Sequence, residues 1–271
     1  MEILRTGQFF GNTNETKTLG GLTLTDTEYT HEKVDWHYHE NAYFTFLLDG
    51  RVLEGNKKEI YHCTAGSLLF HNWQEPHYNI KPKGYTRGFH IEFKPDWFQG
   101  FDLNISNLQG SINLYNPQLK ALMYNVFKES KQDTGSLAVD TLLIELFTMA
   151  TKNETRLSGK VPLWVTKIRD LLNDNSAYDW SLQALSIQLD IHPVHLSRDF
   201  SRYFGCSIGQ YIRTIRVQQS LSMIVKGGSS LTSIALDCGF ADQSHFIRTF
   251  KTLHQITPFA YRKLFADPSI G

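Results

Sequence analysis

The sequence has little cysteine and no long apolar run. Only three of its 271 residues are cysteine, none belongs to a CxxC pair, and three thiols cannot all pair with one another. We therefore expect reduced thiols and a cytoplasmic protein. No apolar run approaches the roughly 18 residues that a membrane span needs. The N-terminus also lacks a basic start followed by an apolar core, so we expect neither a signal peptide nor a membrane partner.

A net charge is also lacking, because 27 Lys and Arg balance 27 Asp and Glu. The balance hides an asymmetry between the two parts of the chain. Residues 1–160 hold 16 Lys and Arg against 19 Asp and Glu, whereas residues 161–271 hold 11 against 8 and contain no Glu. A mildly basic C-terminal part is compatible with binding to phosphates.

The first hundred or so residues have the pattern of β-strands. Four segments (22–32, 42–53, 57–72 and 87–95) are rich in β-branched and aromatic residues and are separated by Gly, Asp-Gly or Pro. Asp49-Gly50 has the composition of a hairpin turn. So many short strands close together predict a small sandwich or barrel.

From about Asn116 the apolar residues follow a helical period. Two apolar-striped helices are expected over 116–152, followed by a polar linker over 151–160. The two helices can form a dimer surface or can pack on the β domain. Every later segment has a helical pattern.

One short stretch of the C-terminal part occurs twice. The residues from Leu185 to Tyr211 recur from Ile234 to Tyr261, at an offset of 49 before a tight turn and 50 after it. Each copy is a short helix, a turn and a second helix, with Asp190 or Gly239 where a left-handed residue is needed. One such pair could be purely structural. Two copies joined by a long helix favour tandem helix-turn-helix units, whose second helices could lie about one DNA turn, ~34 Å, apart.

Residues 161–271 resemble the DNA-binding domain of the AraC/XylS family. The resemblance is carried by IALDCGFADQSHFIRTFKTLHQITPFAYRK (residues 234–263), with its Gly-Phe, its QSHF and its Thr-Pro-x-x-Tyr-Arg. It implies two helix-turn-helix units that bind double-stranded DNA. The positions that it places against bases are Val194, Ser197 and Arg198 in the first unit and Gln243, Ser244, Ile247 and Arg248 in the second. Their chemistry agrees, since Arg pairs with guanine, Gln with adenine, and apolar groups with the thymine methyl.

Other residues of the second helices have different expected roles. Arg202 and Lys251, one turn further on, are expected to meet phosphates. Leu196, Phe200, Phe246 and Phe250 are expected in the core.

The β part contains a group of histidines. His37 and His39 are two residues apart in WHYHENAYFTFLLDG, so they share one face of a strand, and His77 follows in a second motif. Residues 20–95 thereby resemble the two cupin motifs, but Tyr43 stands where the cupin pattern has a Glu ligand. His90 is a further candidate for the same cavity, whereas His31, His62 and His71 are expected at the surface or at strand edges.

Three interpretations of this histidine group stay open. The imidazoles can bind Zn²⁺ or Fe²⁺, can line a metal-free pocket for a small molecule, or can be structural. We expect a metal-free ligand pocket formed by His37, His39, Tyr43 and His77. Because the Glu is missing, we expect no cofactor and no tightly held catalytic metal.

Together these patterns predict a two-domain fold. An N-terminal all-β, cupin-like barrel is expected over 1–105 and a helical dimerisation segment over 106–152. A C-terminal all-α domain is expected over 161–271, with helix-turn-helix units at about 181–204 and 230–254.

The predicted function is that of a regulator, an activator or a repressor, of transcription. We expect a homodimer that binds specific DNA sequences under the control of a small-molecule effector, with RNA polymerase as a further candidate partner. We expect no enzymatic activity. The alternatives are a metal-dependent cupin enzyme, such as a dioxygenase, fused to a DNA-binding module, and a DNA-binding protein without an effector.

Overall fold

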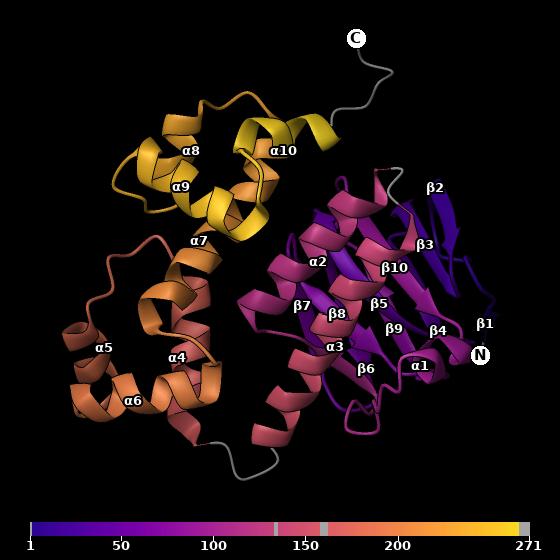
Figure 1. The fold of residues 1–271 in the computed structure, drawn as a ribbon, viewed down its shortest axis with the longest axis horizontal. Coiled ribbons are helices and arrows are strands. Elements are labelled where there is room, and N and C mark those ends of the chain that lie inside the picture. The colour runs from indigo at the N-terminus through magenta and orange to yellow at the C-terminus, as the bar shows by residue number, and fades with distance from the viewer. Residues whose placement is uncertain (1, 133–134, 158–161, 266–271) are drawn as a thin grey trace. The chain divides into compact units, whose positions relative to one another are not determined.

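The computed structural model describes residues 2–132, 135–157 and 162–265. Its contacts divide the chain into two compact units, Met1–Tyr115 with Leu122–Thr151 and Asn116–Ala121 with Lys152–Gly271. The first unit is rich in strands and the second is helical, as Figure 1 shows. The two-domain architecture predicted from the change of period is confirmed.

The described residues of the first unit contain short strands and three helices. The strands are β1 (Glu2–Leu4), β2 (Asn12–Leu19), β3 (Leu22–Glu28), β4 (Lys33–His39), β5 (Ala42–Asp49), β6 (Arg51–Asn56), β7 (Ile60–Thr64), β8 (Leu68–His71), β9 (His77–Ile80), β10 (Arg87–Phe93) and β11 (Ser111–Asn113). The helices are α1 (Pro95–Gly100), α2 (Pro117–Ser130) and α3 (Ser136–Leu157). Helix α2 belongs to this unit from Leu122 onwards.

These strands form two sheets and not one closed barrel, so of the predicted sandwich or barrel the structure has the two-sheet form. One sheet has the order β1-β4-β9-β6-β7 and the other the order β11-β8-β5-β10-β3-β2. The predicted hairpin at Asp49-Gly50 is wrong, because β5 and β6 belong to different sheets. At Gly50 φ is +84°, and a Cβ would lie 2.3 Å from Tyr85 O, so only glycine lets the chain cross between the sheets here.

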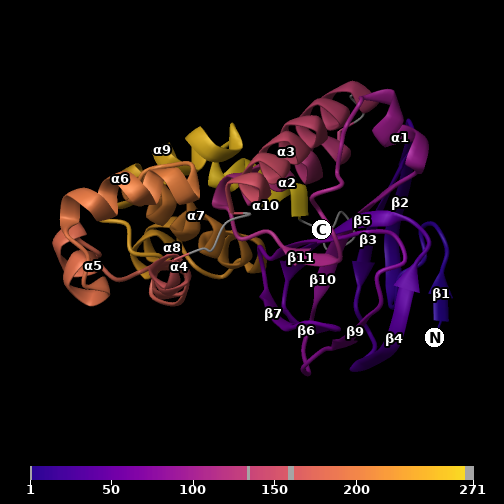
Figure 2. The ribbon, with the colours of Figure 1, turned by 90° about the horizontal axis from the view of Figure 1, so that it is seen from below.

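The six-stranded sheet lies between the helices and the five-stranded sheet (Figure 2). Side chains alternate along β5, so Phe44 and Phe46 face the helices while Tyr43 faces the other sheet. The ring centroids of Phe44 and Phe147 of α3 are 5.0 Å apart, and those of Phe46 and Tyr124 of α2 are 4.5 Å apart. The apolar stripes of α2 and α3 are thus used for packing on this sheet.

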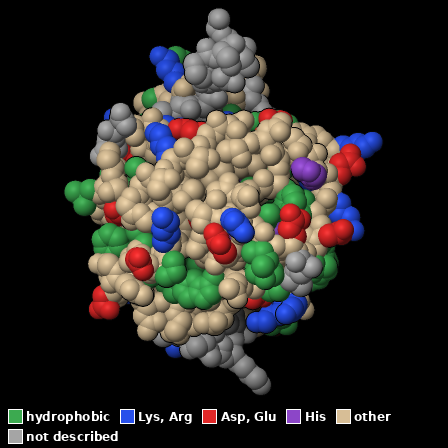
Figure 3. Space-filling model, turned by 90° about the vertical axis from the view of Figure 1, so that its right-hand side faces the viewer, with side chains coloured by type: hydrophobic (Ala, Val, Ile, Leu, Met, Phe, Trp, Pro, Cys, Tyr) green, Lys and Arg blue, Asp and Glu red, His purple; other side chains and the backbone are tan. Residues whose placement is uncertain are grey.

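On the face drawn in Figure 3, side chains of Lys and Arg are interspersed with those of Asp and Glu. A mixed pattern of this kind is typical of a solvated surface and provides no positive patch for phosphates on that face.

The second unit contains helices α4 (Leu163–Asp174), α5 (Leu182–Leu189), α6 (Pro193–Phe204), α7 (Ile208–Lys226), α8 (Leu231–Asp237), α9 (Gln243–His254) and α10 (Pro258–Phe265). Helix α3 extends to Leu157 and takes in much of the stretch predicted as a linker, because Lys, Glu and Arg are good helix formers. Residues 158–160 of that linker lie outside the described residues. Among the described helices, none is both long and apolar enough to span a membrane.

Candidate DNA-binding face and ligand pocket

The first helix-turn-helix unit consists of α5 and α6. Helix α5 ends at Leu189, its C-cap Asp190 has a left-handed φ of 54°, and α6 starts at Pro193. Leu196 and Phe200 of α6 are fully buried against Leu185 of α5 and its neighbours, in the core for which they are predicted. The remaining side of α6 is therefore open to solvent.

The second unit, α8 and α9, repeats this arrangement. Gly239 has a φ of +83°, and a Cβ there would lie 2.7 Å from Ala177 O, so the turn needs glycine. Asp242 caps α9 by accepting a hydrogen bond from His245 N at 2.7 Å. Phe246 and Phe250 are fully buried. The left-handed residues and the core positions that the internal repeat predicts are confirmed in both units.

The residues predicted to contact DNA lie on the open sides of α6 and α9. On α6, exposed positions are Val194, Ser197, Arg198 and Arg202. On α9, Ser244, Arg248 and Lys251 are exposed, whereas Gln243 and Ile247 are half-buried. Because the core of each unit is complete without them, these side chains are available to a partner.

The arginines of the two second helices differ in their surroundings. Arg198 Nε lies 2.9 Å from Asp199 Oδ1, and this hydrogen bond raises the pKa of Arg198 and lowers that of Asp199. Arg248 makes no such side-chain contact with the residues that the structure describes. The guanidinium of Arg198 is therefore engaged with Asp199, whereas no described residue holds that of Arg248 in this way.

Two residues near this face were not anticipated from the sequence. Asp199 holds Arg198, and the Thr232 hydroxyl on α8 donates a hydrogen bond to Gln243 Oε1 on α9. Asp199 follows Arg198 directly in the chain, but the sequence does not show which rotamers the two side chains adopt, so it does not predict that they meet. Thr232 and Gln243 lie in different helices joined by a turn, so the period of a single helix does not show that they meet.

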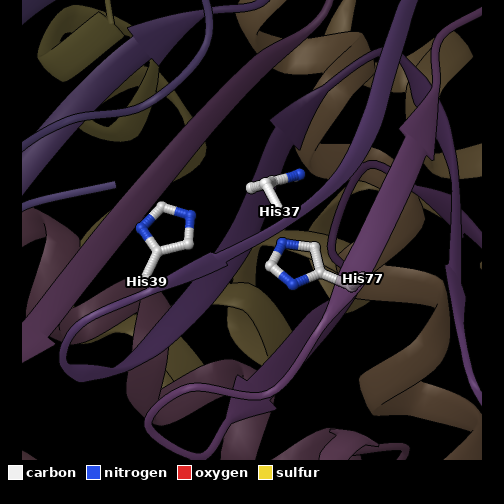
Figure 4. Close-up of side chains that lie close together, drawn as sticks. All are labelled: His37, His39 and His77. Carbon is white, nitrogen blue, oxygen red and sulfur yellow. The ribbon is translucent and has the colours of Figure 1, made fainter. Parts of the chain in front are cut away.

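The candidate ligand pocket lies between the two sheets. His37 and His39 come from β4 and His77 comes from β9, where it is paired directly opposite His37. The ring centroids of His37 and His77 are 4.2 Å apart, and the Tyr43 hydroxyl donates to His77 Nε2 at 3.0 Å. Figure 4 shows the three imidazoles in one space between the strands. The structure thus brings the four predicted residues together, each no more than 2% exposed.

Tyr43 points into this site from a different strand than the sequence predicts. The sequence places it on the same face as His39 if one strand runs through both residues. Instead, β4 ends at His39 and Tyr43 belongs to β5 of the other sheet. It points into the pocket because alternate residues of β5 face the five-stranded sheet.

Burial keeps the pocket histidines neutral. It lowers the pKa of His90 to about 3, and burial with the nearby charge of His37 lowers that of His77 to about 3. Burial also lowers the pKa of His37, and it holds that of His39 well below its usual range. At neutral pH these rings are therefore uncharged and offer lone pairs as well as N–H donors.

His71 and Glu54 are the clearest differences from the sequence-based assignment. His71 is fully buried, with Nδ1 2.9 Å from Ser111 Oγ, so its predicted place at the surface or at a strand edge is wrong. Its Nε2 lies 3.2 Å from Oε1 of Glu54, a buried carboxyl of β6 that lines the pocket. The carboxyl group that the cupin-like motif lacks is thus present from another strand, where no motif marks it.

Replacing Glu54 by Gln should remove a pH dependence of stability. Burial raises the pKa of Glu54 to about 8. The folded protein therefore holds this proton more tightly than the unfolded chain, and the stability that it contributes is lost as pH rises from about 4.5 through about 8. Urea unfolding of wild type at about pH 6 and about pH 9 should show this loss, and Glu54→Gln should show a smaller one.

Exposed Glu32 provides the control for this measurement. Glu32→Gln should follow the wild-type pH profile. An unchanged profile in Glu54→Gln would contradict the assignment of the proton to Glu54.

Two phenylalanines close one side of the pocket. Phe9 stacks on His90 with ring centroids 3.7 Å apart, and Phe10 lies edge-on to His37 at 5.0 Å. Their segment is fixed by a hydrogen bond from Gly7 N to the Glu92 carboxyl group. The sequence did not mark this segment, because it has no strand or helix period.

Comparison with known proteins gives a match in each unit. Residues 19–147 match the family model described as an AraC-like ligand binding domain, and residues 185–264 match a helix-turn-helix domain. These matches define the class of protein: a ligand-binding domain followed by a helix-turn-helix domain. The chain belongs to the AraC family, as the resemblance of its C-terminal part implies.

Individual relatives match over parts of their length. The regulator GadX of Escherichia coli O6:H1 is 31% identical over 108 residues, which is 39% of this chain and 39% of that protein. The regulator MtrA of Neisseria gonorrhoeae is 24% identical over 164 residues, 56% of this chain and 54% of that protein. The chain thus spans about two fifths to one half of these relatives. The crystal structure of an apo ToxT variant from Vibrio cholerae is similar with a TM-score of 0.42 and 15% identity, over 95% of this chain and 100% of that one.

Proposed function

We propose that this protein regulates transcription by binding specific double-stranded DNA through α6 and α9. In this proposal, Arg198, Arg248, Gln243 and the neighbouring positions predicted from the sequence read bases, and Arg202 and Lys251 bind phosphates. The chain's membership of the AraC family supports it. Both matched family models are of binding domains, and the named relatives are regulators. We therefore propose no enzymatic activity.

One observation carries the DNA-binding proposal. The chain contains two helix-turn-helix units, and the second helix of each buries two large apolar residues while its other side exposes polar and cationic ones. A helix that packed against further protein would have an apolar side here. A cationic and amide-bearing surface instead fits base edges and phosphates in a major groove.

Duplex DNA binding tests this proposal. Fluorescence anisotropy of a labelled random-sequence duplex should show binding by the full chain that weakens linearly on a logarithmic salt scale. The matched control is a single-stranded oligonucleotide of equal length, which should bind more weakly. Absence of duplex binding at low salt would contradict the proposal.

We further propose that a small-molecule effector of the β domain controls DNA binding. His37, His39, Tyr43 and His77 are its proposed contacts, because they combine polar groups with an apolar surround. A thermal-shift screen of metabolites tests this part, since a ligand held only by the folded state raises its stability by about 2.7 kcal/mol at a hundredfold excess over Kd. A hit should also change the affinity for DNA, and a hit that does not would contradict control by that ligand.

We also propose a homodimer through the segment 106–152. The apolar stripes of α2 and α3 pack on the sheet, so the dimer must use their outer sides, where Leu137 is 78% exposed. Leu137→Glu should therefore shift the full chain towards monomer in analytical ultracentrifugation, and a fragment of residues 161–271 should be monomeric. Leu163→Glu, which alters an equally exposed leucine outside the segment, should leave the dimer intact. A wild-type chain that is monomeric at every concentration would contradict the dimer.

The remaining parts of the proposal follow from this function. We propose the domain boundaries 1–105, 106–152 and 161–271, with RNA polymerase as a further partner and the cytoplasm as the location. Co-purification of RNA polymerase with the DNA-bound protein, and its absence without DNA, would support RNA polymerase as a partner.

A further inference from the structure

Three imidazoles converge in the pocket from two paired strands. One ring nitrogen from each of His37, His39 and His77 lies within 4.8 Å of those of the other two. All three side chains are buried, and Figure 4 shows the rings around a shared space. Nitrogen ligands in this number are typical of Zn²⁺ and related transition-metal ions.

The hydrogen bonds of two of these rings fix their tautomers. His37 Nδ1 lies 2.9 Å from the Asp35 carbonyl oxygen, and His77 Nδ1 lies 3.1 Å from that of Glu75. A carbonyl oxygen only accepts, so both Nδ1 atoms carry the hydrogen and both Nε2 atoms keep a lone pair. Metal-binding histidines are usually held in this way, with the second nitrogen donating to a carbonyl or carboxylate.

The third ring leaves a buried nitrogen unused. His39 Nδ1 has no hydrogen-bond partner among the described residues, although the side chain is only 2% exposed. An unpaired buried polar group costs about 1–3 kcal/mol. A bound ion in the shared space would stabilise this ring by giving it a partner.

The size of the cavity distinguishes between an ion and an organic molecule. Phe9 and Phe10 fill much of the space between the sheets, and the remaining cavity is about 40 Å³. Pockets for drug-sized ligands are about 300–1,000 Å³, whereas one water needs only about 10–15 Å³. In this conformation the pocket therefore has room for an ion with a water or two, and an organic effector would first have to displace the phenylalanines.

We propose that His37, His39 and His77 bind one divalent transition-metal ion, with Zn²⁺ as the best match, and that this ion is a signal read by the domain. The role as a signal rests on the proposed function, whereas the site itself does not. At Zn–N bonds of about 2.1 Å the nitrogens of a tetrahedral site are about 3.4 Å apart, so a pair of nitrogens must close by at most about 1.4 Å. The fourth position is left to water.

Tyr43 competes with the ion in this arrangement. Its hydroxyl donates to His77 Nε2, the lone pair that the metal needs. Metal binding must therefore break this hydrogen bond, and Tyr43→Phe should bind Zn²⁺ more tightly than wild type.

Zn²⁺ binding to the full chain, purified without a histidine tag, tests the site. Competition with a chromophoric chelator should give one equivalent bound to wild type, at least a tenfold loss in His39→Ala, and a gain in Tyr43→Phe. His62→Ala, which removes an exposed histidine of β7, should match wild type. Far-UV circular dichroism identifies a variant that fails to fold. Misfolding can lower Zn²⁺ affinity but does not raise it, so the higher affinity expected of Tyr43→Phe cannot come from misfolding. Absence of binding by wild type, or equal binding by His39→Ala and His62→Ala, would overturn the site.

The same samples separate this proposal from the proposed function. Zn²⁺ should change the affinity of wild type for duplex DNA and leave that of His39→Ala unchanged. Duplex binding without Zn²⁺ binding would overturn the metal site and leave the regulator standing. Zn²⁺ binding without duplex binding would overturn the DNA-binding function and leave the metal site standing. Zn²⁺ binding that leaves the DNA affinity of wild type unchanged would overturn the ion's role as a signal.

Discussion

Arg248→Ala is expected to weaken binding to the preferred DNA site by about 1–3 kcal/mol and to relax the preference at one base pair. Arg248 lies on the open side of α9, and its side chain makes no hydrogen bond or ion pair with the described residues. A free guanidinium at this place can form two hydrogen bonds with a guanine. The effect should exceed that of Arg198→Ala, because Arg198 must first separate from Asp199.

Lys251→Ala provides the contrast in this experiment. Lys251 lies one turn further along α9 and should meet a phosphate, so its loss should weaken all sequences alike and lower the salt slope by about 1. Lys57→Ala, at an exposed position of the β domain, should have no effect. Affinities are measured on the preferred and on a random duplex. Equal losses on both duplexes for Arg248→Ala would contradict its role in reading bases.

Arg87→Ala is expected to destabilise the β domain by about 3–5 kcal/mol. Asp26 is only 2% exposed, and Arg87 donates to both of its carboxylate oxygens, at 2.8 and 2.6 Å. Lys131 of the segment after α2 adds a third bond at 3.0 Å. Without Arg87 the buried carboxylate keeps Lys131 as its one cation among the described residues, so much of its desolvation is left uncompensated. Urea unfolding at neutral pH measures the loss.

An exposed ion pair is the control for this substitution. Lys33 Nζ lies 2.6 Å from Asp35 Oδ1, but both side chains are well exposed. Lys33→Ala should therefore lower the free energy of unfolding by less than about 1 kcal/mol. The double variant Asp26→Asn with Arg87→Ala should recover part of the loss, because it removes the unpaired charge. Equal stability of Arg87→Ala and wild type would contradict the network.

The pH dependence of this network has a defined sign. Burial by itself would raise the pKa of Asp26, but the hydrogen bonds and charges of Arg87 and Lys131 lower it below its usual value. Stability from Asp26 is therefore present above the pKa of an unfolded aspartate, about 3.9, and is lost as pH falls through the lower folded value. Arg87→Ala should weaken this acid-dependent loss.

The helical domain was largely predictable from the sequence because its signals are local. Gly239 and Asp190 mark turns that need a left-handed residue, and an internal repeat fixes which residues of each second helix are core. Helical periods then place Phe250 inside and Arg248 outside. What the sequence did not provide is side-chain pairing, such as Asp199 with Arg198 or Thr232 with Gln243, because these contacts depend on rotamers or on elements distant in the chain.

The β domain was less predictable because its contacts are non-local. The alternation of side chains along a strand places His37 and His39 on a common face, but it does not show which strands pair, so it does not distinguish a barrel from two sheets. Glu54 and His71 were missed because each lies in a strand whose partner strands are set by the tertiary fold. Phe9 and Phe10 enter the pocket from a segment without any period.

The central claim is that α6 and α9 read a specific DNA sequence together. Selection of binding sites from a random duplex library by the purified full chain tests it most directly. Two short conserved elements about 10 base pairs apart are expected in the selected sequences, because two recognition helices on one face of DNA lie about one helical turn apart. A library that remains random after repeated selection, at a salt concentration where the protein binds duplex DNA, would contradict the claim.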